Sequence, residues 1–258
     1  MAFDLEHAKQ FLKIASLPEK PERFSVAPGM GMPTLEPAKQ QALVVGSNVV
    51  SFTTGVEAQV KQAITDSSLF AQLAATNAVG HDADPLVFFD AYFANLATLG
   101  WQILQKETAE LSSDEDAFDV HQAIIGVTTS FLSPIAGAAA AVLVVLEGLH
   151  KMDADAPFIT LFNRQSHHGE IGRFQLTYIY LDAAHGLRAE AMAFSLKADR
   201  EVMQVLFLKL QKGKTSLRRS TGSLSIDANA MKALQPQLAA KMTDYRKLYI
   251  ADVELGTL

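Results

Sequence analysis

The chain has 258 residues, of which 49% are hydrophobic and 19% are charged, and this composition excludes an intrinsically disordered protein. Its formal net charge of −6 argues against a dedicated nucleic-acid-binding protein, which needs a basic surface. Cysteine is absent, which excludes disulfides, thiolate metal ligands, cysteine nucleophiles and thioester-linked lipids. We therefore expect a globular protein that holds no cofactor or metal and has no nucleic-acid partner.

The first part of the chain, residues 1–40, is predicted to be one helix and a proline-rich arm. The first six residues have neither the basic region nor the apolar core of a signal peptide. We therefore expect synthesis and folding in a cytoplasm, with export by a route that uses no cleaved signal as the alternative. Apolar residues recur at helical spacing across 3–16, and closely spaced prolines then predict an irregular arm over 17–38.

The second part, residues 41–165, is predicted to be mainly helical after one bent strand or two short ones around Gly46. Thr54 is followed three residues later by Glu57, a capping-box signature. This spacing predicts a helix that begins there and continues to about Thr76.

A second, longer helix is predicted to begin at Asp84 and to end at about Leu111. An aspartate followed by Pro85 is typical of an N-cap and a first helical turn. Several aromatic side chains lie within this segment, and we expect them in the core: Phe88, Phe89, Tyr92, Phe93 and Trp101.

Residues 120–146 form an apolar stretch with no Asp, Glu, Lys or Arg. Pro134 divides the stretch, because proline disfavours helix at the preceding residue and is accepted at a first helical position. We predict two helices, 117–131 and 134–151, that pack as a buried hairpin. Two alternatives stay open: a permanent membrane span, which the length alone allows, and release of the hairpin into a bilayer.

This apolar helical pair is the first candidate binding site. If a lipid or membrane is the partner, the side chains that contact it are predicted to be large and apolar. The candidates are Ile124, Ile125, Phe131, Val142, Leu143 and Leu146.

The third part, residues 166–258, is predicted to be an antiparallel sheet with a late helix. Segments 172–181 and 187–196 alternate in polarity and flank a short turn, which predicts a β-hairpin. Residues 202–210 are nearly all apolar and predict a third strand, and a fourth ends by Leu224.

The chain is predicted to end with a helix capped by Asp227 and a closing strand over 249–255. Pro236 lies inside this helix and argues for a break in it. Helices followed by strands indicate an α+β fold, in which a helical N-terminal half packs on a C-terminal antiparallel sheet as one integrated domain.

The second candidate binding site is the basic segment 209–219, which carries five positive charges and no negative one. On a hairpin tip such charges suit anionic lipid headgroups, and on a strand edge they equally prevent edge-to-edge aggregation. A phosphate-binding loop is excluded, because Leu208 stands where that motif requires glycine. The candidate headgroup-binding residues are Lys212, Lys214, Arg218 and Arg219.

The candidate site of an enzyme is a short polar cluster before the predicted sheet. His167, His168 and Glu170 are close in sequence, with Arg164 nearby. On a strand, His168 and Glu170 share a face, as an acid–base pair requires, but two ligands do not make a metal site. A polar surface turn explains the same residues equally well.

Several short motifs resemble those of the Erwinia virulence factor family of bacterial proteins. They are the segments 45–50 (VGSNVV), 68–74 (SLFAQLA) and 99–101 (LGW), followed by an apolar helical pair and an antiparallel sheet. The resemblance spans about residues 40 to 255 and implies an α/β architecture and a non-enzymatic role associated with a host or a membrane. That family carries a fatty acid on a cysteine, and because cysteine is absent here, any lipid would be held non-covalently.

These observations lead to one function and two alternatives. The leading interpretation is a non-enzymatic virulence or toxin-like factor that binds lipid or membrane through the apolar helical pair. The alternatives are an enzyme with a site near His167, His168 and Glu170, and an interaction module of a larger assembly. The sequence predicts neither the oligomeric state nor the ligand.

Overall fold

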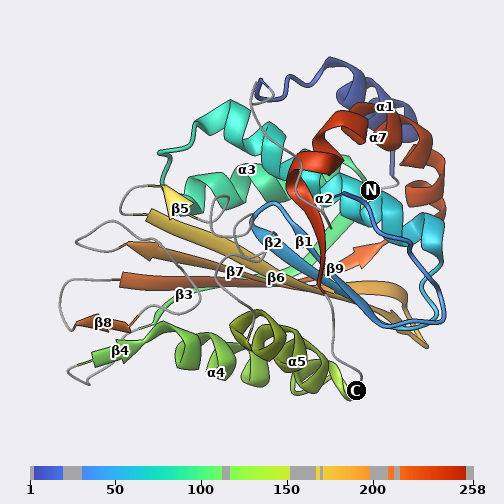
Figure 1. The fold of residues 1–258 in the computed structure, drawn as a ribbon. Helices are drawn as coiled ribbons and strands as arrows, with labels where there is room; N and C mark the ends of the chain where they lie inside the picture. The colour runs from blue at the N-terminus through green and yellow to red at the C-terminus, as the bar shows by residue number, and fades with distance from the viewer. Residues whose placement is uncertain are drawn as a thin grey trace.

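The computed structural model of the chain is a β-sheet between two layers of helices (Figure 1). It describes residues 3–19, 31–111, 117–151, 167–168, 171–197, 209–211 and 216–253. The upper layer in Figure 1 holds α1 (Leu5–Ile14), α2 (Ala58–Val79), α3 (Pro85–Thr98) and α7 (Ala228–Tyr249). The lower layer holds α4 (Val120–Leu132) and α5 (Ala138–Lys151). The predicted α+β class is confirmed.

The sheet is mixed, and both halves of the chain contribute strands to it. Its order is β10-β1-β2-β6-β7-β9-β3, with β5 paired to β6, and among these described strands β2 and β6 form the one parallel pair. The predicted hairpin and closing strand are confirmed as β6–β7 and β10. The strands are β1 (Gln41–Val45), β2 (Asn48–Phe52), β3 (Trp101–Leu111), β5 (His167–His168), β6 (Ile171–Asp182), β7 (Gly186–Lys197), β9 (Ser216–Ile226) and β10 (Ile250–Val253).

A separate two-stranded sheet joins β4 (Ala117–Asp119) to β8 (Lys209–Gln211). The C-terminal end of the predicted strand 202–210 therefore lies in β8. Residues 202–208 lie outside the described part of the chain, as do residues 20–30 of the predicted proline-rich arm.

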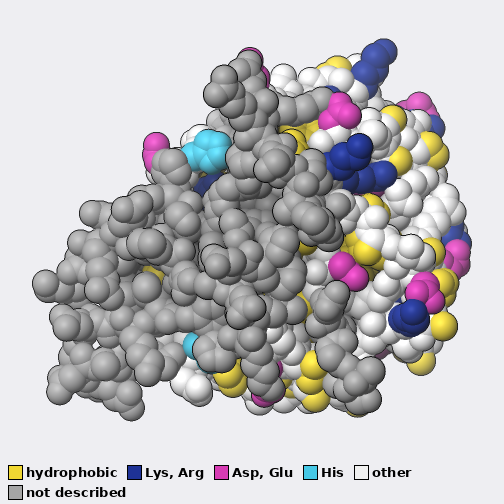
Figure 2. All heavy atoms as spheres, viewed as in Figure 1, with side chains coloured by type: hydrophobic (Ala, Val, Ile, Leu, Met, Phe, Trp, Pro, Cys, Tyr) yellow, Lys and Arg dark blue, Asp and Glu magenta, His cyan; other side chains and the backbone are white. Residues whose placement is uncertain are grey.

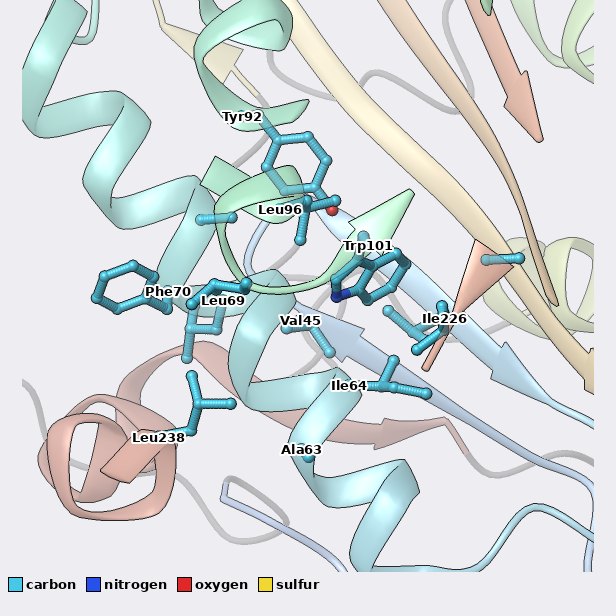
Figure 3. Close-up of a cluster of buried hydrophobic side chains, with 14 of the residues drawn as sticks. Val45, Ala63, Ile64, Leu69, Phe70, Tyr92, Leu96, Trp101, Ile226 and Leu238 are labelled. Atoms are coloured by element: carbon cyan, nitrogen blue, oxygen red, sulfur yellow. The ribbon is translucent and has the colours of Figure 1, made fainter. Parts of the chain in front are cut away.

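Strand alternation divides the interior into two cores, one on each face of the sheet. On β7, Ala189 and Ala191 belong to the upper core, whereas Met192 and Phe194 belong to the lower one. Figure 3 shows the upper core, where Ile64 of α2, Leu96 of α3 and Ile226 of β9 lie near the Trp101 indole, while α7 packs against α2. Every second residue of a central strand therefore faces the lower helical layer.

The predicted helix 84–111 is wrong in its second half. Asp84 caps α3 by accepting a hydrogen bond from the Leu86 N–H at 2.8 Å, but the helix ends at Thr98. Gly100 then adopts φ +93°, a conformation that glycine reaches without strain and that ends helices. The chain continues as β3, which pairs antiparallel with β9.

Two other predictions are also wrong: the start of the helix at Thr54 and the break of the last helix at Pro236. The capping box at Thr54 does not form, because α2 begins at Ala58 with Glu57 as its N-cap and without a side-chain cap. Glu57 instead accepts a hydrogen bond from the Lys232 ammonium at 2.8 Å. Pro236 does not break α7; it lies on the exposed face, where a carbonyl that loses its partner can bind water.

The apolar stretch forms two helices, as predicted, but both begin later than expected. Residues 117–119 form β4 before α4, and Pro134 lies in the turn rather than at the start of α5, where Gly137 adopts φ +76°. Within the described residues, no helix combines the length and apolar character that crossing a bilayer requires.

Candidate functional site

The inner face of the α4–α5 pair packs against the sheet. Ile124, Val142 and Leu146 are at most 3% exposed and belong to the lower core with Phe174 and Phe194 of β6 and β7. Burying one such aliphatic side chain contributes about 1.5–3 kcal/mol. These three predicted lipid-binding residues therefore hold the helical pair on the sheet, and they contact lipid only if the pair leaves it.

The other three predicted lipid-binding residues, Ile125, Phe131 and Leu143, are partly buried. Phe131 and Leu143 pack at the border of the lower core, so each keeps some surface that a ligand can reach. Their role in lipid binding stays a prediction.

The outer face of the α4–α5 pair is unusual, because it carries almost no charge. A helix on the surface of a globular protein normally has charged and polar residues on the face opposite its core. In the view of Figure 2, mainly yellow and white side chains emerge along the lower border, where Figure 1 places α4 and α5. The exposed residues of the pair and its turn are Gln122, Gly126, Thr129, Ser130, Ser133, Pro134, Ala136, Gly137, Ala140 and Glu147.

A cavity of about 510 Å³ opens between the C-terminal end of α4 and the sheet. We call it the α4–sheet slot. Its roof is formed by Ser130, Phe131, Pro134 and Ile135. Its floor is formed by side chains of β3, β6, β7 and β9, which are mostly polar: Gln105, Glu107, Tyr180, Glu190, Arg219, Thr221 and Ser223.

Glu190 is the most buried charged group of the slot, at 7% exposure. Its Oε1 accepts a hydrogen bond from the Tyr180 hydroxyl at 3.1 Å, and its Oε2 accepts one from the Ser223 hydroxyl at 2.6 Å. Burial raises the pKa of the Glu190 carboxyl, and these two hydrogen bonds and Arg188 oppose the rise. Burial and the adjacent carboxylate raise the pKa of Tyr180 to about 12, so the phenol stays protonated.

Arg219 lies at the other end of the same floor, on β9. Its Nη2 donates to Glu107 Oε1 at 3.3 Å, whereas its buried Nε has no hydrogen-bond partner in the described part of the chain. Arg218 contacts Glu110 at 3.9 Å. Both predicted headgroup-binding arginines are thus adjacent to glutamates of β3, and the predicted Lys212 and Lys214 lie outside the described residues.

The slot brings together Phe131 and Arg219, which the sequence assigned to two separate sites. It also contains Tyr180, Glu190 and Ser223, which sequence reasoning missed. The sequence does contain a signal that Glu190 is covered, because in an alternating strand it shares a face with the apolar Met192 and Phe194.

The predicted enzyme site is only partly covered by the structure. His167 and His168 form β5 and pair with Gly172 and Ile171 of β6, and their side chains are not described. Arg164 and Glu170 lie outside the described residues, so the catalytic alternative stays a prediction. Within the described residues, no three His, Asp or Glu side chains are grouped closely enough to hold a metal ion.

Comparison with known proteins shows only weak structural similarity. No family model matches the chain, and no curated protein matches it in sequence. A delta-endotoxin superposes with a TM-score of 0.44 and 11% identity, covering 82% of this chain and 91% of that one. The activated Cyt2Ba monomer from Bacillus thuringiensis subsp. israelensis superposes with a TM-score of 0.35 and 13% identity. The match covers 69% of this chain and 97% of that one.

The structure of the Evf virulence factor is similar over 96% of this chain and 92% of its own, with a TM-score of 0.31 and 9% identity. The resemblance predicted from the sequence thus has a counterpart in a weak structural likeness. With TM-scores below 0.5, these likenesses establish neither the family nor the function of the chain.

Proposed function

We propose that this protein is a non-enzymatic virulence or toxin-like factor that binds lipid or a membrane surface through the α4–α5 pair. The observation that carries the proposal is the nearly uncharged outer face of that pair, where Glu147 is the one exposed Asp, Glu, Lys or Arg among residues 120–149. The virulence or toxin-like part of the proposal comes from the family resemblance in the sequence.

The physical reason is the cost of moving charge toward a bilayer. A charged side chain at the centre of a membrane helix costs about 2.5–3.5 kcal/mol, whereas small uncharged residues such as Gly126 and Ala140 cost far less. Small residues also allow close approach of a helix to its surroundings. The outer face can therefore contact acyl chains while the inner face stays packed on the sheet.

The test is flotation of the purified protein with neutral and anionic vesicles. The informative variant is Thr129→Glu with Ala140→Glu, because both positions are exposed and the change leaves the lower core intact. We expect vesicle binding to fall about tenfold or more, a loss of about 1.4 kcal/mol or more. Ala233→Glu, at an exposed position of α7, is the matched control and is expected to bind like the wild type.

The salt dependence of binding separates the two candidate surfaces. Binding through the apolar pair survives high salt, whereas binding through the basic segment 209–219 is screened. Failure of the wild type to float with any vesicle contradicts the proposal. Binding that the double glutamate variant retains contradicts the assignment to the α4–α5 face.

A further inference from the structure

Glu190 is a buried carboxylate that has no cationic partner among the residues that the structure describes. Its two oxygens accept hydrogen bonds from neutral hydroxyls, those of Tyr180 and Ser223, and among the described residues no ion pair includes it. Arg188 is near enough to act on it through space but forms no salt bridge with it in the described part of the chain. Because a buried charge is ordinarily paired, this carboxylate is a candidate partner for a bound cation.

We propose that the α4–sheet slot binds a cationic amine or quaternary ammonium group against Glu190, as the choline or ethanolamine headgroup of a lipid would supply. The inference deepens the proposed function and rests on it for the lipid as the source of the ammonium group. The charged residues that line the slot are Glu107, Glu190 and Arg219. Because Arg219 is paired with Glu107, the negative charge of Glu190 is left in excess.

The aromatic groups of the slot suit the same ligand. The Tyr180 ring contributes to the floor beside Glu190, and the Phe131 ring contributes to the roof. The faces of such rings attract ammonium groups, and a quaternary ammonium is well recognised by aromatic side chains together with a carboxylate. The cavity of about 510 Å³ is within the range of small-molecule sites.

Arg219 supplies the complementary charge at the other end of the floor. Glu190 lies opposite Ser223, and Arg219 lies four residues before Ser223 on the same face of β9. The N–H of its buried Nε finds no acceptor within the described ranges, and such a donor is suited to a phosphate oxygen. A lipid headgroup that joins an ammonium to a phosphate carries both charges.

The first experiment measures binding of free choline by equilibrium dialysis. Its neutral isostere, 3,3-dimethylbutan-1-ol, serves as the competitor that lacks the charge. We expect the wild type to bind choline and not the alcohol. In Glu190→Gln, which keeps the shape, we expect choline affinity to fall about tenfold or more, as loss of a charge-assisted contact implies. Glu6→Gln, an exposed residue of α1, is the control with the same change in charge.

Ser223→Ala is a second variant that keeps the carboxylate and removes one hydrogen bond. We expect it to weaken choline binding less than Glu190→Gln does. Equal binding of choline and the alcohol by the wild type overturns the inference without recourse to any variant. Unchanged choline binding in a folded Glu190→Gln also overturns it.

A vesicle experiment identifies the source of the ammonium group. Vesicles of phosphatidylcholine and of phosphatidylglycerol with the same acyl chains are compared by flotation. Preference for phosphatidylcholine that Glu190→Gln abolishes supports a lipid headgroup. Choline binding without flotation supports a free amine and contradicts the proposed function, whereas flotation on both vesicles without choline binding overturns the ammonium site and leaves the proposed function standing.

Discussion

Glu190 on β7 lies directly opposite Ser223 on β9, and the Ser223 hydroxyl donates a hydrogen bond of 2.6 Å to its carboxylate. The pair sits on the face of the sheet that α4 covers, next to the C-terminal end of that helix and among the mostly polar side chains of the slot floor. The register of two strands thus places a charged group in a covered position. Such a placement costs stability, and it is expected where binding benefits from the charge.

The burial of Glu190 predicts a particular pH dependence of stability. Its pKa is raised above the ordinary value of 4.5, so the folded protein holds the proton more tightly than the unfolded chain. As pH rises from 4.5 through the raised pKa, the contribution of Glu190 to the free energy of unfolding therefore decreases. Glu190→Gln lacks this contribution, because its side chain does not titrate.

Urea unfolding of both proteins across pH 4.5 to 7.5 checks this prediction. We expect the free energy of unfolding of the wild type, relative to that of Glu190→Gln, to fall as the pH rises. A difference between the two proteins that is constant over this range contradicts a raised pKa at Glu190.

Replacing the buried amide of Gln175 by an apolar side chain is predicted to stabilise the fold. It is 1% exposed on β6, and neither its amide oxygen nor its amide nitrogen has a hydrogen-bond partner among the described residues. Because an unsatisfied buried polar group costs about 1–3 kcal/mol, we expect Gln175→Leu to raise the free energy of unfolding by about 1 kcal/mol or more. Urea unfolding at neutral pH measures this, and a loss of stability would show that the amide is satisfied.

The opposite result is expected for Asn48, which lies in register with Gln175 on β2. Its Nδ2 donates to the Ser68 hydroxyl at 3.1 Å, and its Oδ1 accepts from the Thr177 hydroxyl at 3.1 Å. The Ser68 hydroxyl lies 3.2 Å from the Tyr92 hydroxyl, which extends the network to α3. Asn48→Leu is expected to lower the free energy of unfolding by about 2 kcal/mol or more, since two buried hydroxyls lose a partner.

The two substitutions make a matched pair, because each replaces a buried amide by leucine on adjacent strands. The same urea titration serves both. If Asn48→Leu and Gln175→Leu change stability in the same direction, hydrogen-bond satisfaction is not what decides their effects.

The ion pair of Asp66 and Arg246 links α7 to α2. Arg246 Nε donates to Asp66 Oδ1 at 2.8 Å, its Nη2 contacts Oδ2, and Asp66 is fully buried. Burial raises the Asp66 pKa, although Arg246 opposes the rise. Arg246→Met leaves the carboxylate uncompensated, and we expect it to lower the free energy of unfolding by about 3–5 kcal/mol.

Removing both charges of the ion pair is predicted to recover most of the free energy of unfolding that Arg246→Met loses. We expect the double variant Asp66→Leu with Arg246→Met to be close to the wild type in urea unfolding, because no charge is then left buried. Lys247→Met, at the exposed neighbouring position of α7, is the control and is expected to change little. A double variant as unstable as Arg246→Met would mean that packing, rather than charge, sets the cost.

The β6–β7 hairpin was predictable because its alternating residues flank a short turn. β3 was not, because its Leu, Gln, Lys, Glu and Ala residues favour helix. Gly100 ends α3, and pairing with β9 then overrides the local preference of β3. Local propensity therefore failed where a partner distant in sequence decides the conformation.

The candidate site was predictable only in pieces. Phe131 and Arg219 were each identifiable as a candidate contact, one by its apolar surroundings and one by its charge. Their meeting in one slot depends on the position of α4 over the β7–β9–β3 part of the sheet, which no local pattern contains. Glu190 was missed because a carboxylate in a strand ordinarily faces solvent.

The central claim, that the outer face of the α4–α5 pair contacts a bilayer, is tested most directly by an environment-sensitive fluorophore on that face. Because the chain has no cysteine, Ala140→Cys gives one labelling position on α5, and Ala233→Cys gives a control on α7. On addition of vesicles, we expect a blue shift and quenching by spin-labelled lipid at position 140 and neither at position 233. Emission at position 140 that is unchanged by vesicles to which the protein binds would contradict the claim.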